Sequence, residues 1–244
     1  MAIKSIQWHQ HTLSISYDIV NPSAKYDLVV LHGWGSNKEL MKDAFGKELD
    51  TFRHIYIDLP GFGNSSSATV MNSRDYAEII SLFFEEVGIK KDMIMGHSFG
   101  GKVATLLEPD FLVLLSSAGI LEPKSLKVWV KIYTFKLFKL LGLTFLREKF
   151  VADDAKKLEP HMYETFKNVI GEDFEAVFRH YRKKCLILWG KHDTATRLSS
   201  GQRIHNLVSQ SQFHAYDSDH YFFLHFVKEI AERIKNTYIS YLKS

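Results

Sequence analysis

The chain of 244 residues is 45% hydrophobic and 24% charged, the composition of an ordinary globular protein large enough to bury a core without disulfides. Its net charge of +3 is too small to favour nucleic acid as a partner, and its single cysteine, Cys185, excludes an intrachain disulfide. The sequence shows neither a signal peptide nor a long apolar run, and so predicts a cytoplasmic protein without a transmembrane segment.

Two segments near the amino terminus alternate polar and apolar residues, which is typical of strands with one buried face. They predict an antiparallel hairpin over 3–8 and 13–19. Short continuous apolar runs follow, and such runs indicate strands buried on both faces of a parallel sheet. These runs cover 28–31, 53–57, 93–95, 111–115, 185–189 and, more weakly, 212–216.

Helical patterns lie between these strands and after the last one. They cover 38–49, 73–87 and 222–242. In the second pattern, Asn72 or Ser73 is expected to cap the start of the helix and Gly88 to end it. Strands that alternate with helices indicate parallel pairing through right-handed crossovers. The sequence therefore predicts an α/β fold in a single domain over 1–244, with a mostly parallel eight-stranded sheet and helices on both faces.

Residues 120–183 interrupt this alternation with helical patterns that contain no strand signal, punctuated by Pro123 and Pro160. Because the segment falls between the strands predicted at 111–115 and 185–189, we interpret it as a helical cap inserted into the domain rather than as an independent domain.

Part of this cap is strongly basic. Residues 124–149 carry seven basic side chains and one acid, a net charge of +6. Helical spacing places Lys124, Lys127 and Lys131 on one face. The simplest interpretation is a solvated face of a lid whose aromatic side chains line a cavity. Docking of an acidic partner such as acyl carrier protein, or contact with an anionic membrane surface, are alternatives. No nucleic-acid-binding motif accompanies the charge.

The segment Gly96-His97-Ser98-Phe99-Gly100-Gly101 follows the apolar run at 93–95. A serine between glycines at a sharp turn from a strand into a helix is the nucleophile-elbow pattern G-x-S-x-G. The turn is tight, so a Cβ atom at Gly96 or Gly100 is expected to collide with neighbouring elements. The pattern makes Ser98 the candidate nucleophile.

A serine hydroxyl needs an adjacent base. In this pattern the histidine comes last in the chain, in a loop before the final helix, where His220 lies. His214 falls inside a predicted strand and His225 lies one turn into the last predicted helix, so both are poorly placed. His192 precedes Asp193, which is the candidate acid of the next paragraph, and we interpret His192 as a solvated loop residue.

The base must in turn be oriented by an acid that follows a late strand. Asp193 follows the run at 185–189 in this way. Asp217 and Asp219 are alternatives because they are close to His220 in the sequence. We predict Asp193 as the acid because of its position after the strand.

A serine that attacks a carbonyl group forms a tetrahedral intermediate with a negatively charged oxygen. This oxyanion needs N–H donors. One is expected from the residue after the nucleophile, here the main-chain N–H of Phe99, and the other from the loop at 32–35. The glycines of that loop let the backbone approach a substrate closely, and the N–H of Trp34 is its expected donor.

Together these segments resemble the α/β-hydrolase superfamily: HGWG at 32–35, DLPGFGNS at 58–65, GHSFGG at 96–101, WGKHD at 189–193, and His220 before the last helix. The resemblance implies a serine hydrolase that acts through an acyl-enzyme without a metal or organic cofactor. Its expected substrate is a carboxylic ester of a small or medium acyl group. The chain is also similar to C–C hydrolases of meta-cleavage pathways and to pimeloyl-acyl-carrier-protein methyl ester esterases. A non-catalytic, ligand-binding member of this fold is the alternative from another class.

Overall fold

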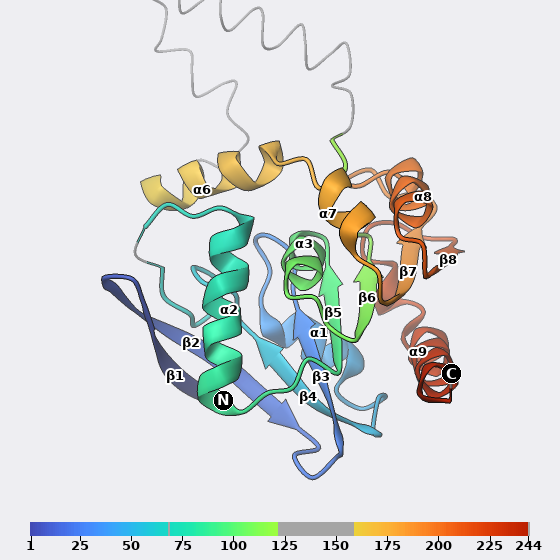
Figure 1. Ribbon diagram of the computed structural model, residues 1–244, viewed down its shortest axis with the longest axis horizontal. Coiled ribbons are helices and arrows are strands. Elements are labelled where there is room, and N and C mark those ends of the chain that lie inside the picture. Colours follow the sequence, from blue (N-terminus) through green and yellow to red (C-terminus); the bar gives the residue numbers. More distant parts are fainter. Residues whose placement is uncertain (68, 122–158, 244) are drawn as a thin grey trace, which may run out of the picture.

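A computed structural model describes residues 1–67, 69–121 and 159–243 of the chain. Within these ranges, eight strands form one sheet in the order β1-β2-β4-β3-β5-β6-β7-β8 (Figure 1). The strands are β1 (Ala2–Trp8), β2 (His11–Val20), β3 (Tyr26–Leu31), β4 (Phe52–Ile57), β5 (Met93–His97), β6 (Phe111–Leu115), β7 (Lys184–Gly190) and β8 (Ser211–Tyr216).

Pairing in the sheet is antiparallel only at the amino-terminal edge, where β1 pairs with β2 and β2 pairs with β4. The pairs from β4 through β3, β5, β6 and β7 to β8 are parallel. Every residue of the central strands β5 and β6 is buried, which explains why they read as continuous apolar runs. The predicted mostly parallel eight-stranded sheet is confirmed.

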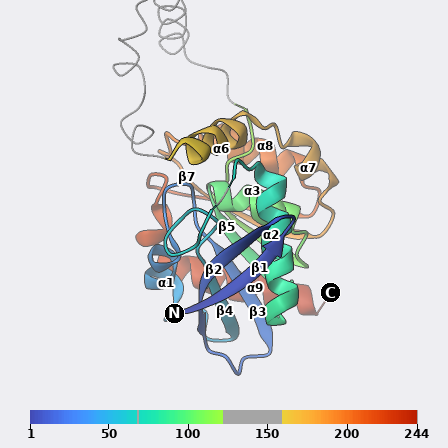
Figure 2. The same ribbon diagram turned by 90° about the vertical axis from the view of Figure 1, so that its left-hand side faces the viewer.

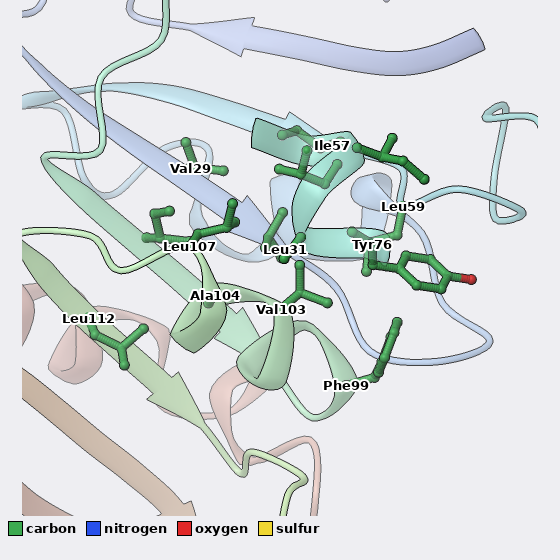
Figure 3. Close-up of a cluster of buried hydrophobic side chains, with 14 of the residues drawn as sticks. Val29, Leu31, Ile57, Leu59, Tyr76, Phe99, Val103, Ala104, Leu107 and Leu112 are labelled. Atoms are coloured by element: carbon green, nitrogen blue, oxygen red, sulfur yellow. The ribbon is translucent and has the colours of Figure 1, made fainter. Parts of the chain in front are cut away.

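Helices cover both faces of this sheet. They are α1 (Lys38–Phe45), α2 (Ser73–Val87), α3 (Phe99–Leu106), α6 (Pro160–Gly171), α7 (Glu175–His180), α8 (Leu198–Leu207), α9 (Val227–Leu242) and the 3₁₀ turn η2 (Phe222–Leu224). One hydrophobic cluster joins the sheet to α2, α3, α7 and α8, and a second joins its other face to α1 and α9. In the first cluster, Val103 and Leu107 of the α3 segment face Val29 and Leu31 of β3 (Figure 3).

The limits of two helices differ from the sequence prediction. The helix predicted over 38–49 ends at Phe45, where the N–H of Gly46 bonds to the carbonyl of Lys42, although Leu49 is still buried. The helix predicted over 222–242 divides into η2 and α9, which leaves His225 at the end of the 3₁₀ turn. Apolar spacing continues through both breaks, so periodicity alone could not locate them.

The predicted cap over 120–183 is described in its second part, which contains α6 and α7. Figures 1 and 2 show α6 beside the amino-terminal end of α2. Lys124, Lys127 and Lys131 lie outside the described residues. The described helices include none that is long and apolar enough to cross a lipid bilayer.

Candidate active site

The turn from β5 into α3 has the strained geometry expected of a nucleophile elbow. Ser98 adopts φ 51° and ψ −115°, a conformation that non-glycine residues rarely occupy. A Cβ on Gly96 would overlap the main chain at Gly100, and a Cβ on Gly100 would overlap the main-chain oxygens of Leu31 and His32. The two glycines therefore allow β5, α3 and the end of β3 to meet at Ser98.

The structure brings His220 and Asp193 into direct contact from loops that follow β8 and β7. The Nδ1–H of His220 donates to Oδ2 of Asp193 over 2.6 Å. The two loops meet because β7 and β8 are neighbouring parallel strands, whose carboxyl ends lie at the same edge of the sheet. The Asp193 side chain is fully buried, whereas 14% of the His220 side chain is exposed.

Several donors surround the Asp193 carboxylate. Oδ1 accepts from the N–H groups of Ala195 and Thr196, each over 2.8 Å, and Oδ2 lies 2.9 Å from the Thr196 hydroxyl. Burial alone would raise the pKa of Asp193, but hydrogen bonds from His220 and the Thr196 N–H outweigh it and hold that pKa below its ordinary value. Asp193 is thus a buried anion that can stabilise a protonated His220.

The alternative histidines are engaged elsewhere. His192 is exposed, and its Nε2 lies 2.8 Å from Oδ1 of Asp217, which is also exposed. His214 is in β8 beside the guanidinium of Arg233, at 3.1 Å. His225 is exposed at the end of η2.

The remaining alternative acid, Asp219, is exposed and does not pair with the imidazole of His220 in the described part of the chain. Its Oδ1 instead accepts from the N–H of Tyr221 over 2.9 Å. Of the three candidate acids, the structure therefore places only Asp193 against His220.

His97, which precedes Ser98 in the chain, contacts His220. The ring of His97 lies 4.6 Å from the ring of His220 between centroids, and its Nε2 lies 3.1 Å from the His220 carbonyl oxygen. Among the described residues, no hydrogen bond joins the Ser98 hydroxyl to the His220 imidazole. Such bonds are often long or misaligned until a substrate binds.

Ser98 opens onto a cavity of about 490 Å³, which Trp34 and Phe99 also line. Their rings pack edge to face, with centroids 5.5 Å apart. Phe99 is the first residue of α3, where a helix leaves its N–H groups without partners in the helix. Apolar side chains from α6 complete much of the lining, including Phe166, Val169 and Ile170.

Sequence reasoning missed three residues around this site. His97 was treated only as the variable residue of the motif, although it contacts the His220 loop. Thr196 was not singled out, although the segment after Asp193 supplies most of that carboxylate's donors. Lys102 had no signal beyond its position four residues after Ser98, yet it is buried in the cavity wall.

Among the described residues, no cluster of histidine, cysteine and carboxylate side chains could hold a metal ion.

The family model of the "Alpha/beta hydrolase family" matches residues 28–233, which include all the candidate site residues. A curated relative, the pimeloyl-[acyl-carrier protein] methyl ester esterase of Proteus mirabilis, is 34% identical over 86 residues. The alignment covers 35% of this chain and 32% of that esterase, so the chain matches about a third of its relative's length.

Solved structures share the fold over nearly the whole chain. An esterase from Exiguobacterium antarcticum superposes with a TM-score of 0.74 at 19% identity, over 98% of this chain and 99% of the esterase. The meta-cleavage product hydrolase of Pseudomonas fluorescens superposes with a TM-score of 0.67 at 20% identity, over 96% and 98% of the two chains. At these identities the likeness concerns the fold.

Proposed function

The chain belongs to the alpha/beta hydrolase family, and from this premise we propose that it is a serine hydrolase that cleaves carboxylic esters of small or medium acyl groups through an acyl-enzyme. The observation that carries the proposal is the bond of 2.6 Å between His220 and the buried Asp193, on the same edge of the sheet as the strained turn at Ser98. A base held by a buried acid, on the edge of the sheet where a half-buried serine opens onto a cavity, is the arrangement that nucleophilic acyl transfer requires.

In the proposed reaction, the Ser98 oxygen attacks the ester carbonyl while its proton passes to Nε2 of His220. Nε2 can accept this proton because the bond to Asp193 keeps the other proton on Nδ1. The N–H groups of Trp34 and Phe99 would hold the negative oxygen of the tetrahedral intermediate. The intermediate expels the alcohol, which takes the proton from His220, and leaves the acyl group on Ser98. Water, activated by His220, then hydrolyses the acyl-enzyme.

Labelling with a fluorophosphonate probe tests this proposal directly. The wild-type chain should form a covalent adduct at Ser98, and S98A should form none. The H220A variant should react far more slowly, because the serine loses its base. Intact-protein mass spectrometry and peptide mapping locate the adduct. A folded wild-type chain that does not react would contradict the proposal and favour a non-catalytic, ligand-binding role.

Hydrolysis of a C–C bond in a 2-hydroxy-6-oxo-dienoate is the alternative reaction. Such a vinylogous diketone also presents a carbonyl to a serine nucleophile, so the same three side chains could serve both reactions. Initial rates with p-nitrophenyl esters of increasing acyl length, measured beside the dienoate, distinguish them. Turnover of the esters supports the proposal, whereas turnover of the dienoate alone would reject the esterase activity.

A narrower proposal concerns the molecule that carries the ester. The similarity to pimeloyl-[acyl-carrier protein] methyl ester esterases and the basic segment at 124–149 support an ester carried by an acidic acyl carrier protein. Lys124, Lys127 and Lys131 would contact the carrier. The double variant K127E/K131E should then lose activity on an acyl-carrier ester and keep its activity on p-nitrophenyl acetate. Equal effects on both substrates would contradict carrier docking.

A further inference from the structure

Lys102 places a buried positive charge in the wall of the cavity beside Ser98. It lies in α3, four residues after Ser98, and only 2% of its side chain is exposed. A buried lysine is costly unless it is paired and hydrogen-bonded. Its partners therefore indicate what the side chain does.

Three groups surround the Lys102 ammonium. Its Nζ lies 2.5 Å from the carbonyl oxygen of Val169 and 2.6 Å from Oε2 of Glu172. It also lies 4.3 Å from the centre of the Phe174 ring, within the range of a cation–π contact. An ammonium has three donors. Two of them bond to Val169 and Glu172, and the Phe174 ring lies against the ammonium, so the charge is engaged within the protein. These contacts argue for a structural role rather than for a substrate-binding group.

Glu172 connects this charge to a third helix. Its Oε1 accepts from the main-chain N–H of Ser73 over 3.0 Å, and its Oε2 accepts from the Ser73 hydroxyl. Ser73 is the first residue of α2, where N–H groups lack partners within the helix. The Asn72 side chain accepts from the N–H groups of Arg74 and Asp75. Glu172 therefore supplies the acceptor for the N–H of Ser73, which the N-cap side chain does not bind.

The two charges also match the dipoles of the helices that they touch. Val169 is in the last turn of α6, where unpaired carbonyl groups favour a cation such as Lys102. Glu172 directly follows α6, and its carboxylate lies at the amino end of α2, where N–H groups favour an anion. The trio Lys102, Glu172 and Ser73 thus joins α3, the carboxyl end of α6 and the amino end of α2.

The helix held by this trio forms one side of the cavity. Phe166, Val169 and Ile170 of α6 line it, and the Phe166 ring lies 5.3 Å from the ring of Trp34. We propose that Lys102 is a positioning residue for acyl specificity: through Glu172 it holds the apolar wall of α6 at a set distance from Ser98, which is on the same helix segment as Lys102. The inference rests on the ester hydrolysis proposed above.

The variant K102M tests this role because methionine keeps a long side chain and removes the charge. We expect an octanoyl chain to reach the α6 side chains that line the cavity, and the much shorter acetyl group to stay close to Ser98. The ratio of kcat/KM for p-nitrophenyl octanoate to that for p-nitrophenyl acetate should therefore fall about tenfold in K102M, as expected when an apolar pocket loses contact with part of its substrate. K102R, which keeps the charge, should restore most of the ratio.

A matched control removes another largely buried ion pair far from the cavity. Arg53 pairs with Asp27 through two bonds of 2.7 Å at the amino-terminal ends of β4 and β3, the end of the sheet opposite Ser98. R53M should therefore lower stability without changing the acyl ratio. Hydrogen exchange adds a readout that does not depend on activity: amides of 160–171 should exchange faster in K102M than in wild type or R53M.

An unchanged acyl ratio and unchanged exchange over 160–171 in K102M would overturn the inference, as would an equal change of ratio in R53M. If K102M does not fold, E172Q removes the opposite charge and should shift the ratio in the same direction. Absence of ester turnover by the wild type would contradict the proposed function instead, and the exchange comparison would still test whether Lys102 holds α6.

Discussion

At the scale of single residues, His97 holds the loop of the candidate base although it has no part in the proposed proton transfers. Its Nε2 must carry the hydrogen, because the His220 carbonyl oxygen, 3.1 Å away, can only accept. Its Nδ1 is buried and has no hydrogen-bond partner among the described residues. Burial lowers the pKa of His97 to about 3, so the ring is neutral at the pH of any ordinary assay.

The variant H97F should therefore impair positioning of His220 rather than remove a catalytic group. Phenylalanine keeps a ring beside His220 but cannot donate to its carbonyl. We expect kcat for p-nitrophenyl acetate to fall roughly 10- to 100-fold, the range that a misplaced catalytic group produces, with a smaller change in KM. Steady-state kinetics measure both constants. A wild-type kcat in H97F would show that the bond does not position His220.

At the scale of elements, α2 shows how local chemistry sets a helix boundary. Asn72 and Asp75 form a capping box in which each side chain accepts from the other residue's main-chain N–H. At the other end, Gly88 adopts φ 70° and ψ 47°, the left-handed conformation that ends helices. Both signals lie within a few residues of the boundary, which is why the sequence predicted this helix correctly at 73–87.

Loss of the cap should have a measurable cost. The variant N72A leaves the N–H groups of Arg74 and Asp75 without their acceptor and should lower the free energy of unfolding by about 1 kcal/mol. Urea denaturation measures this difference. The matched control is N236A, an exposed position inside α9, where alanine favours the helix and stability should stay within about 0.5 kcal/mol of wild type. Equal losses in both variants would exclude a specific effect of the cap.

At the scale of the whole molecule, buried histidines make stability depend on pH. Burial lowers the pKa of His32 to about 4 and that of His97 to about 3, whereas an unfolded histidine titrates near 6.5. Below about pH 6.5 the unfolded chain therefore binds protons that the folded chain does not. Stability present at neutral pH is lost as the pH falls from about 6.5 toward 4.

The free energy of unfolding should then decrease by up to about 1.4 kcal/mol per pH unit for each of these two histidines within this range. Urea midpoints measured between pH 7.5 and 4.5 test the slope. In H97F one of the two groups is gone, so the decrease should be shallower than in wild type. A stability that is constant from pH 7 to pH 5 would contradict the prediction.

The sequence by itself determined what depends on neighbours along the chain. The apolar runs of β5 and β6 and the caps of α2 act over a few residues, and the G-x-S-x-G spacing lies within one short segment. These local patterns were sufficient to predict the sheet and the sharp turn. The distant contacts required the tertiary structure. The sequence favoured Asp193 as the acid for His220 from its position after a strand but left Asp217 and Asp219 as alternatives. The contact forms with Asp193 because β7 and β8 are neighbours, and Lys102 meets Glu172 because α6 returns to α3 and α2. Such pairs depend on how strands and helices are placed in space, and local sequence patterns carry no record of that placement.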